Sequence, residues 1–482
     1  MMTIQSVSIA WPALLPIVIL AAGGLLVMLV DLVSRNASRA VLYGIGIVSC
    51  IAAFASMLPL YGQSITTLNG AYAADRYSWT IDALLLMTLA ITFLLSSLRR
   101  ADDGGSPGSY AALLIFCTIG GMVMAGANNL IIIFLGIEQL SLALYVLAGT
   151  GYPRPASQEA SLKYVLLGSL ASGFLIYGSA LLYGSAGSVA LSALAKPAAA
   201  LAPLFVAGFA LFIVGIAFKL ALSPFHTWTP DVYEGSPLAV TAYMSVAVKV
   251  ATFAVLARVV YVVFGHDSAA LAPIWVLAVF SMLVGNLGAL RQRNLKRLLA
   301  FSSIAQAGYI VVALAGVQPS GLSAMLFYLV AYAFTNLGAF AVIALLGDGD
   351  EAYADLDAFR GLFFRRPWPA AAMALFVFSL AGIPATAGFY GKILLLQQAL
   401  SAGVWGITLA VALVVGTLIS FYAYGKIVWM MYAYVEGEAP QAPGNSLASW
   451  IAIGAGAVGT LLFGILPQVF YAAQPFLSAA AK

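Results

Sequence analysis

Stretches of about 20 apolar residues recur along nearly the whole of this 482-residue chain, and they limit the class of fold that it can adopt. A stretch of that length spans the hydrocarbon core of a bilayer as an α-helix, which satisfies its own backbone polar groups. Hydrophobic residues make up 63% of the chain and charged residues 8%, far from the balance of a soluble domain. The sequence therefore predicts an all-α integral membrane protein.

We expect fourteen membrane spans in a single polytopic domain, residues 1–482, of which the twelfth is interrupted. They lie at approximately 11–30, 40–60, 79–98, 109–127, 128–151, 159–184, 201–224, 237–264, 270–289, 297–316, 321–347, 369–400, 404–434 and 447–466. The N-terminal residues carry no basic segment and no cleavage pattern of a signal peptide, so the first span is expected to be retained.

The basic residues between the spans predict the orientation of the chain. Odd-numbered loops carry Arg35, Arg39, Arg99, Arg100, Arg154, Arg291, Arg293, Lys296, Arg297, Arg360, Arg365 and Arg366, whereas even-numbered loops carry Arg76 and Lys196. Loops rich in Lys and Arg stay on the cytoplasmic side. An even number of spans then places both termini on the outer, periplasmic side.

Four ionisable residues lie deep inside the apolar runs: Glu138, Lys219, Lys249 and Lys392. A charge at the centre of a bilayer costs roughly 2.5–3.5 kcal/mol, so four of them cost on the order of 10 kcal/mol. Such residues commonly mark an ion or proton path. We therefore expect the chain to move protons or other ions.

Two of the spans contain helix-breaking residues beside a lysine. In the seventh span, Pro224 lacks an N–H and should free the carbonyl of Leu220, next to Lys219. In the twelfth, SLAGIPATAGFYGK (379–392) combines three glycines and a proline just before Lys392. Unpaired backbone persists in a membrane where it meets protein or water inside a cavity. We expect both helices to be discontinuous and both lysines to face a hydrated interior.

A faint internal repeat accompanies these breaks. QLSLALYVLAG (139–149) resembles QAGYIVVALAG (306–316) at an offset of 167 residues, and Lys219 and Lys392 stand 173 apart. A unit of five helices would make the two copies inverted, as in many transporters. The expected parts are residues 1–108 with helices 1–3, repeats at 109–264 and 270–434, and a C-terminal helix region at 447–482.

The buried charges suggest a switchable proton carrier. Burial disfavours the charged form of lysine, whereas a nearby carboxylate favours it. An ion pair between Glu138 and Lys219 that forms and breaks would therefore act as a protonation switch, although a static pair could simply hold helices together. Lys249 would serve as a relay, and Lys392 would pass the proton to the outer side.

Other polar residues allow two interpretations each. Lys163 could belong to the path or extend to the cytoplasmic surface, and Lys426 is expected to extend to the surface. His226, in the loop after the broken seventh helix, could relay protons near pH 7 or fill the break. Arg258, late in the eighth span, is expected to reach a membrane interface.

The chain offers no recognisable redox or nucleotide site. Cys50 and Cys117 lie in apolar spans without a CxxC context and are expected to be inert thiols. With His226 and His266 as its two histidines, the chain cannot hold the stacked haem pairs of multi-haem proteins. Nucleotide-binding loops and a basic face for nucleic acid are also missing from the sequence. We expect no cofactor in this chain and no nucleic-acid partner.

Two long strings, FKLALSPFHTWTPDVYEGSP (218–237) and DLDAFRGLFFRRPWPAAAMALFVFSLAGIPATAGFYGK (355–392), resemble the antiporter-like membrane subunits of respiratory complex I. The resemblance extends from the fourth to the thirteenth span. It implies a fold of fourteen helices with two inverted five-helix repeats. It also implies roles for the buried residues: Glu138 and Lys219 as the control pair, Lys163 as a modulating residue, Lys249 as the central relay and Lys392 as the terminal lysine.

Branches of this family differ at two places. One branch typically has Glu where Lys392 stands, and another extends past the last span with a long lateral helix; this chain has Lys and ends at Lys482. Ala385 stands where the family commonly has a second proline, which concerns the shape of the break.

By resemblance, the chain is a proton-translocating subunit of an NADH:quinone oxidoreductase in the bacterial inner membrane. FMN, iron–sulfur clusters and quinone are expected in partner subunits, which include sibling antiporter-like subunits, and membrane lipids surround the chain. Two alternatives remain open. The chain could belong to a multisubunit cation/proton antiporter, or it could be a structural membrane subunit that conducts nothing.

Overall fold

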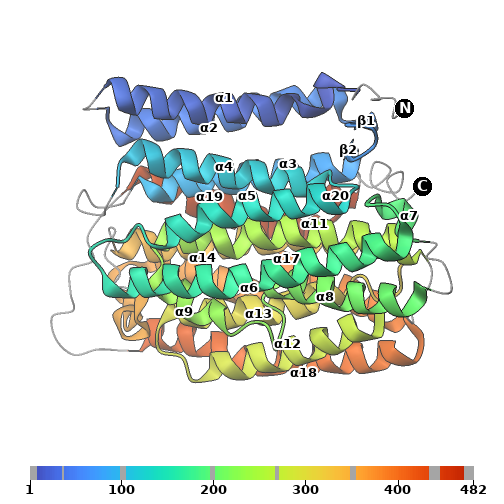
Figure 1. Cartoon of the computed structure of the whole chain (residues 1–482). Coiled ribbons are helices and arrows are strands. Elements are labelled where there is room, and N and C mark those ends of the chain that lie inside the picture. The colour runs from blue at the N-terminus through green and yellow to red at the C-terminus, as the bar shows by residue number, and fades with distance from the viewer. Residues whose placement is uncertain are drawn as a thin grey trace.

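The computed structural model describes residues 8–34, 37–97, 105–195, 201–265, 271–347, 354–433 and 446–471. Several residues and segments discussed above lie outside these ranges: Arg35, Arg99, Arg100, Lys196, His266 and residues 472–482. The described chain is a bundle of long helices that run roughly side by side (Figure 1).

The first part of the bundle contains the following elements: α1 (Trp11–Val33), α2 (Arg39–Met57), η1 (Leu58–Leu60), β1 (Ile65–Thr67), β2 (Tyr72–Ala74), α3 (Arg76–Ser96), α4 (Pro107–Ala125), α5 (Leu130–Ala148), α6 (Pro155–Ala186), α7 (Leu191–Leu194), α8 (Ala202–Leu220), α9 (Trp228–Gly235), α10 (Leu238–Tyr243), η3 (Met244–Val248), α11 (Lys249–Val259) and η4 (Val260–Phe264). The second part contains α12 (Ala272–Leu290), α13 (Leu295–Val312), α14 (Pro319–Gly347), η7 (Leu356–Phe359), α15 (Leu362–Arg365), α16 (Pro367–Ala381), α17 (Ala387–Leu400), α18 (Gly403–Tyr432), α19 (Leu447–Ile465) and α20 (Gln468–Tyr471).

The all-α membrane architecture predicted from the sequence is confirmed. Among the described residues, thirteen helices are long and apolar enough to cross a membrane. The predicted twelfth span, 369–400, is divided into the shorter helices α16 and α17. Fourteen crossings and the inverted repeat stay predictions, because they depend on how these two half-helices lie in the membrane.

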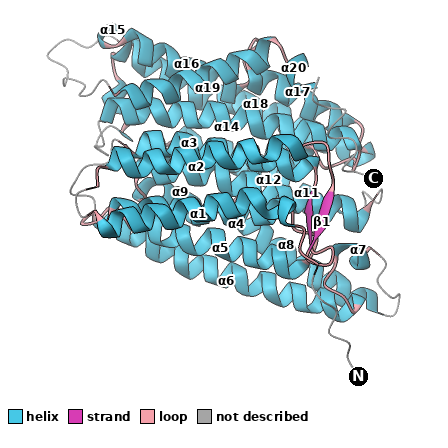
Figure 2. Cartoon of the chain, turned by 90° about the horizontal axis from the view of Figure 1, so that it is seen from above, coloured by secondary structure: helices cyan, strands magenta, loops and turns pink. Residues whose placement is uncertain are grey.

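The short elements gather at the two ends of the bundle. The antiparallel pair β1 and β2, together with α7 and α20, lies at one end of the long helices. Figure 2 shows β1, α7 and α20 again at one end, with α9 and α15 at the other. The helices therefore share one axis, with irregular structure at either end, as a membrane-spanning bundle requires.

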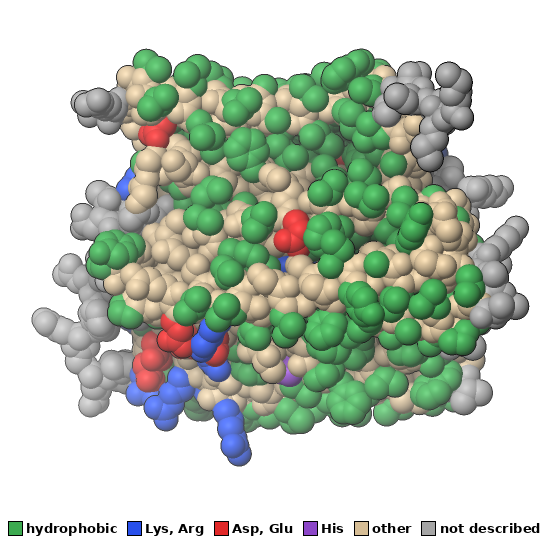
Figure 3. Space-filling view, viewed as in Figure 1, with side chains coloured by type: hydrophobic (Ala, Val, Ile, Leu, Met, Phe, Trp, Pro, Cys, Tyr) green, Lys and Arg blue, Asp and Glu red, His purple; other side chains and the backbone are tan. Residues whose placement is uncertain are grey.

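The outer surface of the bundle is mainly apolar. Figure 3 shows hydrophobic side chains over most of one face, with acidic and basic side chains gathered near one end of it. Large apolar side chains such as Leu32 and Trp429 are more than three-quarters exposed. Exposing these apolar side chains to water would be costly, so this surface is suited to contact lipid or other membrane subunits.

The seventh span is discontinuous, as predicted. Helix α8 ends at Leu220 because Ala221 adopts a left-handed conformation, with φ of 59°. The chain then passes through residues 221–227 before α9 continues toward the end of the bundle. The prediction that the Leu220 carbonyl leaves the helical ladder is confirmed, since a side-chain amine occupies it instead.

The twelfth span is discontinuous as well. Helix α16 ends at Ala381, capped by Gly382 with φ of 90°, and α17 begins at Ala387. Ala385 lies in the break with φ of 69°, a value that a proline ring cannot adopt. A proline at this position would therefore be incompatible with the observed backbone of the break.

Helix α17 packs closely against α16 at Gly388. A Cβ at this position would overlap the backbone carbonyl oxygen of Ser379, which a side-chain rotation cannot relieve. We expect Gly388→Ala to destabilise the chain by about 1–3 kcal/mol, the range for overpacking. Gly425→Ala, at a helical glycine with open space around it, is the matched control. Equal unfolding temperatures of the two variants in detergent would contradict the packing at this break.

Candidate functional site

Three lysines are buried inside the bundle, near the two helix breaks. Lys219, Lys249 and Lys392 are 3%, 2% and 5% exposed, so none of them extends to the lipid surface. Placing an amine there without a compensating partner is costly, and each of the three does have one. The partners of Lys249 and Lys392 are carbonyls at the ends of the broken helices, whereas the partner of Lys219 is a tyrosine of α5.

Lys219 lies in the last turn of α8, inside a box of aromatic rings. Its Nζ donates to the hydroxyl of Tyr145 at 3.2 Å and lies 5.3 Å from the centre of that ring. It also lies 5.8 Å from the ring of Tyr164, which stacks on Trp228. Trp228 in turn donates to the Phe218 carbonyl, so α9 closes the box from the far side of the break. Aromatic faces stabilise a cation in such a desolvated place.

Glu138 does not contact Lys219 directly. Its carboxylate accepts a hydrogen bond from Ser172 of α6, whereas Lys219 binds Tyr145, two turns further along α5. No pair between Glu138 and Lys219 falls within 4.0 Å in the part of the chain that the structure describes. The expected ion pair is therefore open here, with Tyr145 and Ser172 holding the two groups.

Lys249 opens α11, directly after the π-helical turn η3. Its Nζ donates to the Leu220 carbonyl at 2.9 Å, the group left free where α8 ends. Single π-helical turns inside α-helices are frequent at functional sites because they shift the side chains that follow. The break in α8 and the irregular turn before Lys249 thus bring the second lysine next to the first.

Lys392 has an equivalent partner at the second break. Its Nζ donates to the carbonyls of Leu380 and Ala381 at 3.0 and 2.8 Å, the last residues of α16. The amine also lies 5.0 Å from the ring centre of Tyr309. Lys219 and Lys392 are nevertheless not at matching places, because Lys219 precedes its break and Lys392 follows its own. Lys249 is the counterpart of Lys392, because both amines bind carbonyls at the end of a broken helix.

Buried hydroxyls and amides lie between the two breaks. Asn336 of α14 donates to the Ser245 hydroxyl, four residues before Lys249. The Tyr328 hydroxyl donates to Gln306 Oε1 at 2.5 Å, and Gln306 Nε2 donates to the Leu380 carbonyl at 3.3 Å. Leu380 is also a partner of Lys392, so polar groups extend from η3 toward the second break.

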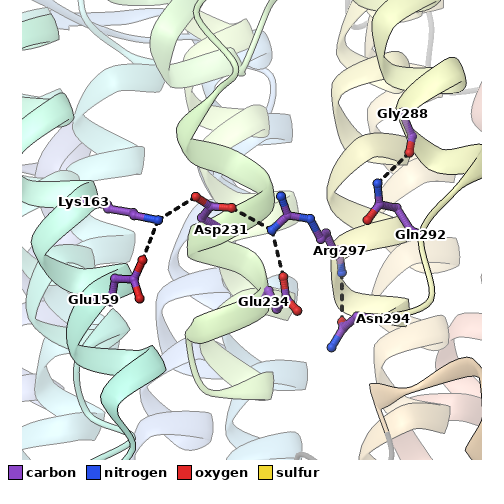
Figure 4. Close-up of polar contacts among 8 residues, drawn as sticks. All are labelled: Glu159, Lys163, Asp231, Glu234, Gly288, Gln292, Asn294 and Arg297. Atoms are coloured by element: carbon purple, nitrogen blue, oxygen red, sulfur yellow. Dashed lines mark hydrogen bonds and ion pairs between the residues drawn. The ribbon is translucent and has the colours of Figure 1, made fainter.

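Lys163 belongs to a charged network at one end of the bundle, away from Lys219. It contacts Glu159 at 2.6 Å and Asp231 at 2.7 Å, and Asp231 contacts Arg297 at 2.7 Å. Figure 4 shows Asp231 between the two cations, and Glu234, also of α9, contacts the same nitrogen of Arg297. The side chain of Lys163 is 39% exposed, which agrees with its extension to the surface.

The network keeps Asp231 ionised. Burial alone would raise the pKa of Asp231, but hydrogen bonds from Lys163 and Arg297 and their positive charges lower it below its ordinary value. With Glu159 and Glu234, these residues line a cavity of about 270 Å³. The cavity is therefore a highly charged mouth at this end of the bundle, large enough to hold water.

His226 lies in the first break, half-buried, between α8 and α9. Its Nδ1 has no hydrogen-bond partner among the described residues, and the Thr229 amide donates to its backbone carbonyl. These contacts leave the role of His226 open.

Lys426 is part-buried and donates to the Gln292 carbonyl at 3.2 Å.

Arg258 contacts residues that lie between the spans, Asp75 before α3 and Asn128 before α5, so its expected position near a membrane interface stays a prediction. Its guanidinium contacts Asp75, the N-cap of α3, at 3.0 Å, and donates to Asn128 and to the Ala125 carbonyl. The side chains of Arg258 and Asp75 are 9% and 11% exposed. The arginine turns inward because α3 brings a carboxylate to it, which the sequence of α11 alone does not reveal.

Two further buried charges were missed. Asp82 of α3 is 1% exposed, and neither of its oxygens has a hydrogen-bond partner among the described residues. Its position inside an apolar stretch of the sequence is enough to predict a buried acid. Lys296, counted above with the cytoplasmic loop, is fully buried and donates to the Ser236 carbonyl at 2.6 Å. Because its neighbours in the sequence are charged, Lys296 was expected in a loop.

The described residues contain no group of three or more His, Cys, Asp or Glu side chains that could hold a metal ion. Cys50 and Cys117 are free and buried. The chemistry that this arrangement supports is proton binding by lysines, with hydroxyls and carbonyls around them.

Comparisons with known proteins identify the family of the chain. The profile of the NADH:quinone oxidoreductase/Mrp antiporter transmembrane family matches residues 127–420. NADH-quinone oxidoreductase subunit N of Gemmatimonas aurantiaca is 39% identical over 476 residues, which cover 94% of this chain and 91% of that protein.

Solved structures show the same fold. A chain of respiratory complex I from Thermus thermophilus superposes with a TM-score of 0.82 at 35% identity, covering 96% of this chain and 99% of that one. A chain of the Mrp complex from a Dietzia species superposes with a TM-score of 0.85 at 24% identity, covering 98% of each chain, and shares the fold. This chain belongs to the NADH:quinone oxidoreductase/Mrp antiporter family of transmembrane subunits.

Proposed function

We propose that this chain is the antiporter-like subunit N of a bacterial respiratory complex I and that it moves protons across the inner membrane. Its similarity to a curated subunit N extends over nearly the whole chain. The observation that carries the mechanism is that buried lysine amines bind the carbonyls freed at both helix breaks. Carbonyls at a break can hold an ammonium and release a neutral amine, which is what a proton carrier needs.

In the proposed cycle, Glu138 and Lys219 control uptake. A change in partner subunits would bring their side chains together or apart, and Tyr145 and Ser172 would hold them in the open state. Closing the pair favours the ammonium form of Lys219, whereas opening it favours release. The proton then passes to Lys249 and leaves through Lys392. Lys163 would modulate uptake from the charged mouth.

His226 is proposed as a relay within the first break. The unpartnered Nδ1 supports this role, since a free ring nitrogen can accept a proton from water. The alternative, that the ring only fills the break, predicts that His226→Gln leaves proton transfer unchanged.

The proposed topology follows the loop charges. Fourteen crossings, with α16 and α17 forming the twelfth, place both termini on the periplasmic side. Residues 109–264 and 270–434 would be the inverted repeats, residues 1–108 would add three helices, and residues 447–482 would add the last. Breaks at α8 and α16 in corresponding helices of the two halves support this division.

Energy for transport must come from elsewhere in the complex. Moving one proton against 100 mV requires about 2.3 kcal/mol. We propose that partner subunits with FMN, iron–sulfur clusters and quinone supply it, while this chain contributes no cofactor of its own. Sibling membrane subunits would cover part of the apolar surface.

Lys219→Ala and Lys392→Ala test this function. If the chain pumps, each variant complex should assemble and bind its partners normally. In sealed vesicles during NADH oxidation, Lys392→Ala should lose proton translocation and Lys219→Ala should lower it. A structural subunit would instead lose assembly. Full pumping by both variants would refute the assignment of these lysines.

The second candidate is a subunit of a cation/proton antiporter. The superposition on the Mrp complex chain favours it as far as the fold goes. Purification separates the two candidates, because a complex that contains this chain either oxidises NADH with quinone or does not.

A further inference from the structure

We propose that protons enter this chain by a second route, along α13, which joins the polar groups between the two lysine centres without passing Lys219 or Lys249. The route starts at the charged cavity of Figure 4 and runs through Lys296 and Tyr233 to Ser303. This inference rests on the proposed function and adds an inlet to it.

Lys296 lies directly behind the mouth of the cavity. It precedes Arg297, which lines the cavity, and its Nζ binds the carbonyl of Ser236, which follows the cavity residue Gly235. The side chain is fully buried, unlike that of Lys163 at the same mouth. A buried amine one residue behind a charge cluster is placed to take a proton from it.

The Ser236 hydroxyl supports this placement. It is buried, and it has no hydrogen-bond partner among the described residues. The Ser236 carbonyl accepts from Lys296 and, at 3.4 Å, from Thr241. Buried hydroxyls are normally paired, so an unpaired one beside an amine suggests a place for a bridging water.

Ser303 of α13 lies between two elements of the route. Helix α9, which carries Tyr233, packs against α13, and the Tyr332 hydroxyl of α14 donates to Ser303 Oγ at 3.1 Å. All three side chains are at most 2% exposed. Ser303 thus connects the side of the cavity with the polar groups between the helix breaks.

From Ser303 the route follows one face of α13. Gln306 is three residues further along, so it lies on the same face of the helix. It accepts from Tyr328, and Tyr328 and Tyr332 are four apart on α14. Gln306 then donates to the Leu380 carbonyl, which also binds Lys392. A proton that reaches Ser303 is therefore close to the terminal lysine.

Water is required between Lys296 and Ser303. These residues are seven apart, about 10.5 Å along the helix at 1.5 Å per residue, and Tyr233 occupies part of that distance. Amide and carbonyl groups orient water but do not carry protons themselves. The relaying groups are the Lys296 amine, the hydroxyls of Tyr233, Ser303 and Tyr328, and the waters between them.

Two substitutions test the route in the assembled complex. Lys296→Arg keeps a positive charge and its donors but cannot release a proton at any accessible pH. Tyr233→Phe removes one hydroxyl and preserves shape. The matched control is Tyr243→Phe, whose hydroxyl is also buried but contacts Thr118 on α4, away from the route. Protons translocated per NADH oxidised are measured in vesicles with equal amounts of assembled complex.

We expect Lys296→Arg and Tyr233→Phe to lower this ratio, and Tyr243→Phe to leave it unchanged. A normal ratio for Lys296→Arg would show that the lysine acts as a fixed charge, and it would overturn the route. A normal ratio for Tyr233→Phe would do the same, whatever the arginine variant does. Lys392→Ala is measured beside them: if it loses pumping while Tyr233→Phe does not, the route fails and the proposed function stands.

Discussion

Arg258→Leu is expected to destabilise the chain by about 3–5 kcal/mol, the cost of leaving one member of a buried ion pair without its partner. The guanidinium binds Asp75 through both of its terminal nitrogens, at 3.0 and 3.2 Å. It also lies 5.4 Å from the ring centre of Tyr77. Removing it leaves the carboxylate of Asp75 buried with its N-cap bond to Ser78 as its remaining partner.

The prediction is checked by equilibrium unfolding of the purified chain in detergent. The matched variant is Asp75→Asn with Arg258→Leu, which removes both charges and keeps a side-chain oxygen to cap α3. We expect this double variant to recover much of the lost stability, because no uncompensated charge remains. If the free energy of unfolding of Arg258→Leu falls by less than about 1 kcal/mol, the ion pair behaves like a solvent-exposed one, which would contradict its burial.

The breaks could be predicted from the sequence because their cause is local. A proline without an N–H, and glycines clustered within ten residues, interrupt a helix wherever it packs. The same is true of the long apolar runs, which specify helices in a bilayer by length and composition. For the same reason the sequence predicts the free Leu220 carbonyl, although it does not predict which group binds it.

The contacts of the buried charges depended on tertiary structure instead. Nothing in the sequence near Lys249 indicates that its amine reaches α8, and nothing near Arg258 indicates that α3 supplies an acid. Glu138 and Lys219 were expected to pair because they have opposite charges, yet an aromatic hydroxyl takes the lysine. Opposite charge predicts attraction, whereas packing decides which donors and acceptors meet.

Lys296 shows the limit of reading charge from loops. It stands among Arg291, Arg293 and Arg297, so a count of basic residues assigns it to the surface. One residue along a helix turns a side chain by about 100°, and this turn directs Lys296 inward while Arg297 remains at the cavity. Only the packing of α9 against α13 distinguishes the two.

The second large effect concerns Lys249, the amine between the first helix break and the polar groups of α14. Lys249→Met keeps the length of the side chain but removes the group that takes up the proton. An unsupported charge in this interior costs several kcal/mol, which corresponds to a transfer rate lower by about a hundredfold or more. We therefore expect proton translocation by way of Lys219 to be lost in the variant, which leaves only what enters along α13. The complex should still assemble, because the methionine side chain fills the space of the lysine.

Lys426→Met is the matched control for Lys249→Met, since Lys426 also donates to a backbone carbonyl but lies part-buried near the end of the bundle. Proton translocation in sealed vesicles should survive that substitution. Lys249→Arg adds a second comparison, because arginine holds the charge permanently and should fail as methionine does. If Lys249→Arg pumped normally, the position would need only a positive charge beside the Leu220 carbonyl, and protons would have to pass between the two breaks by another residue.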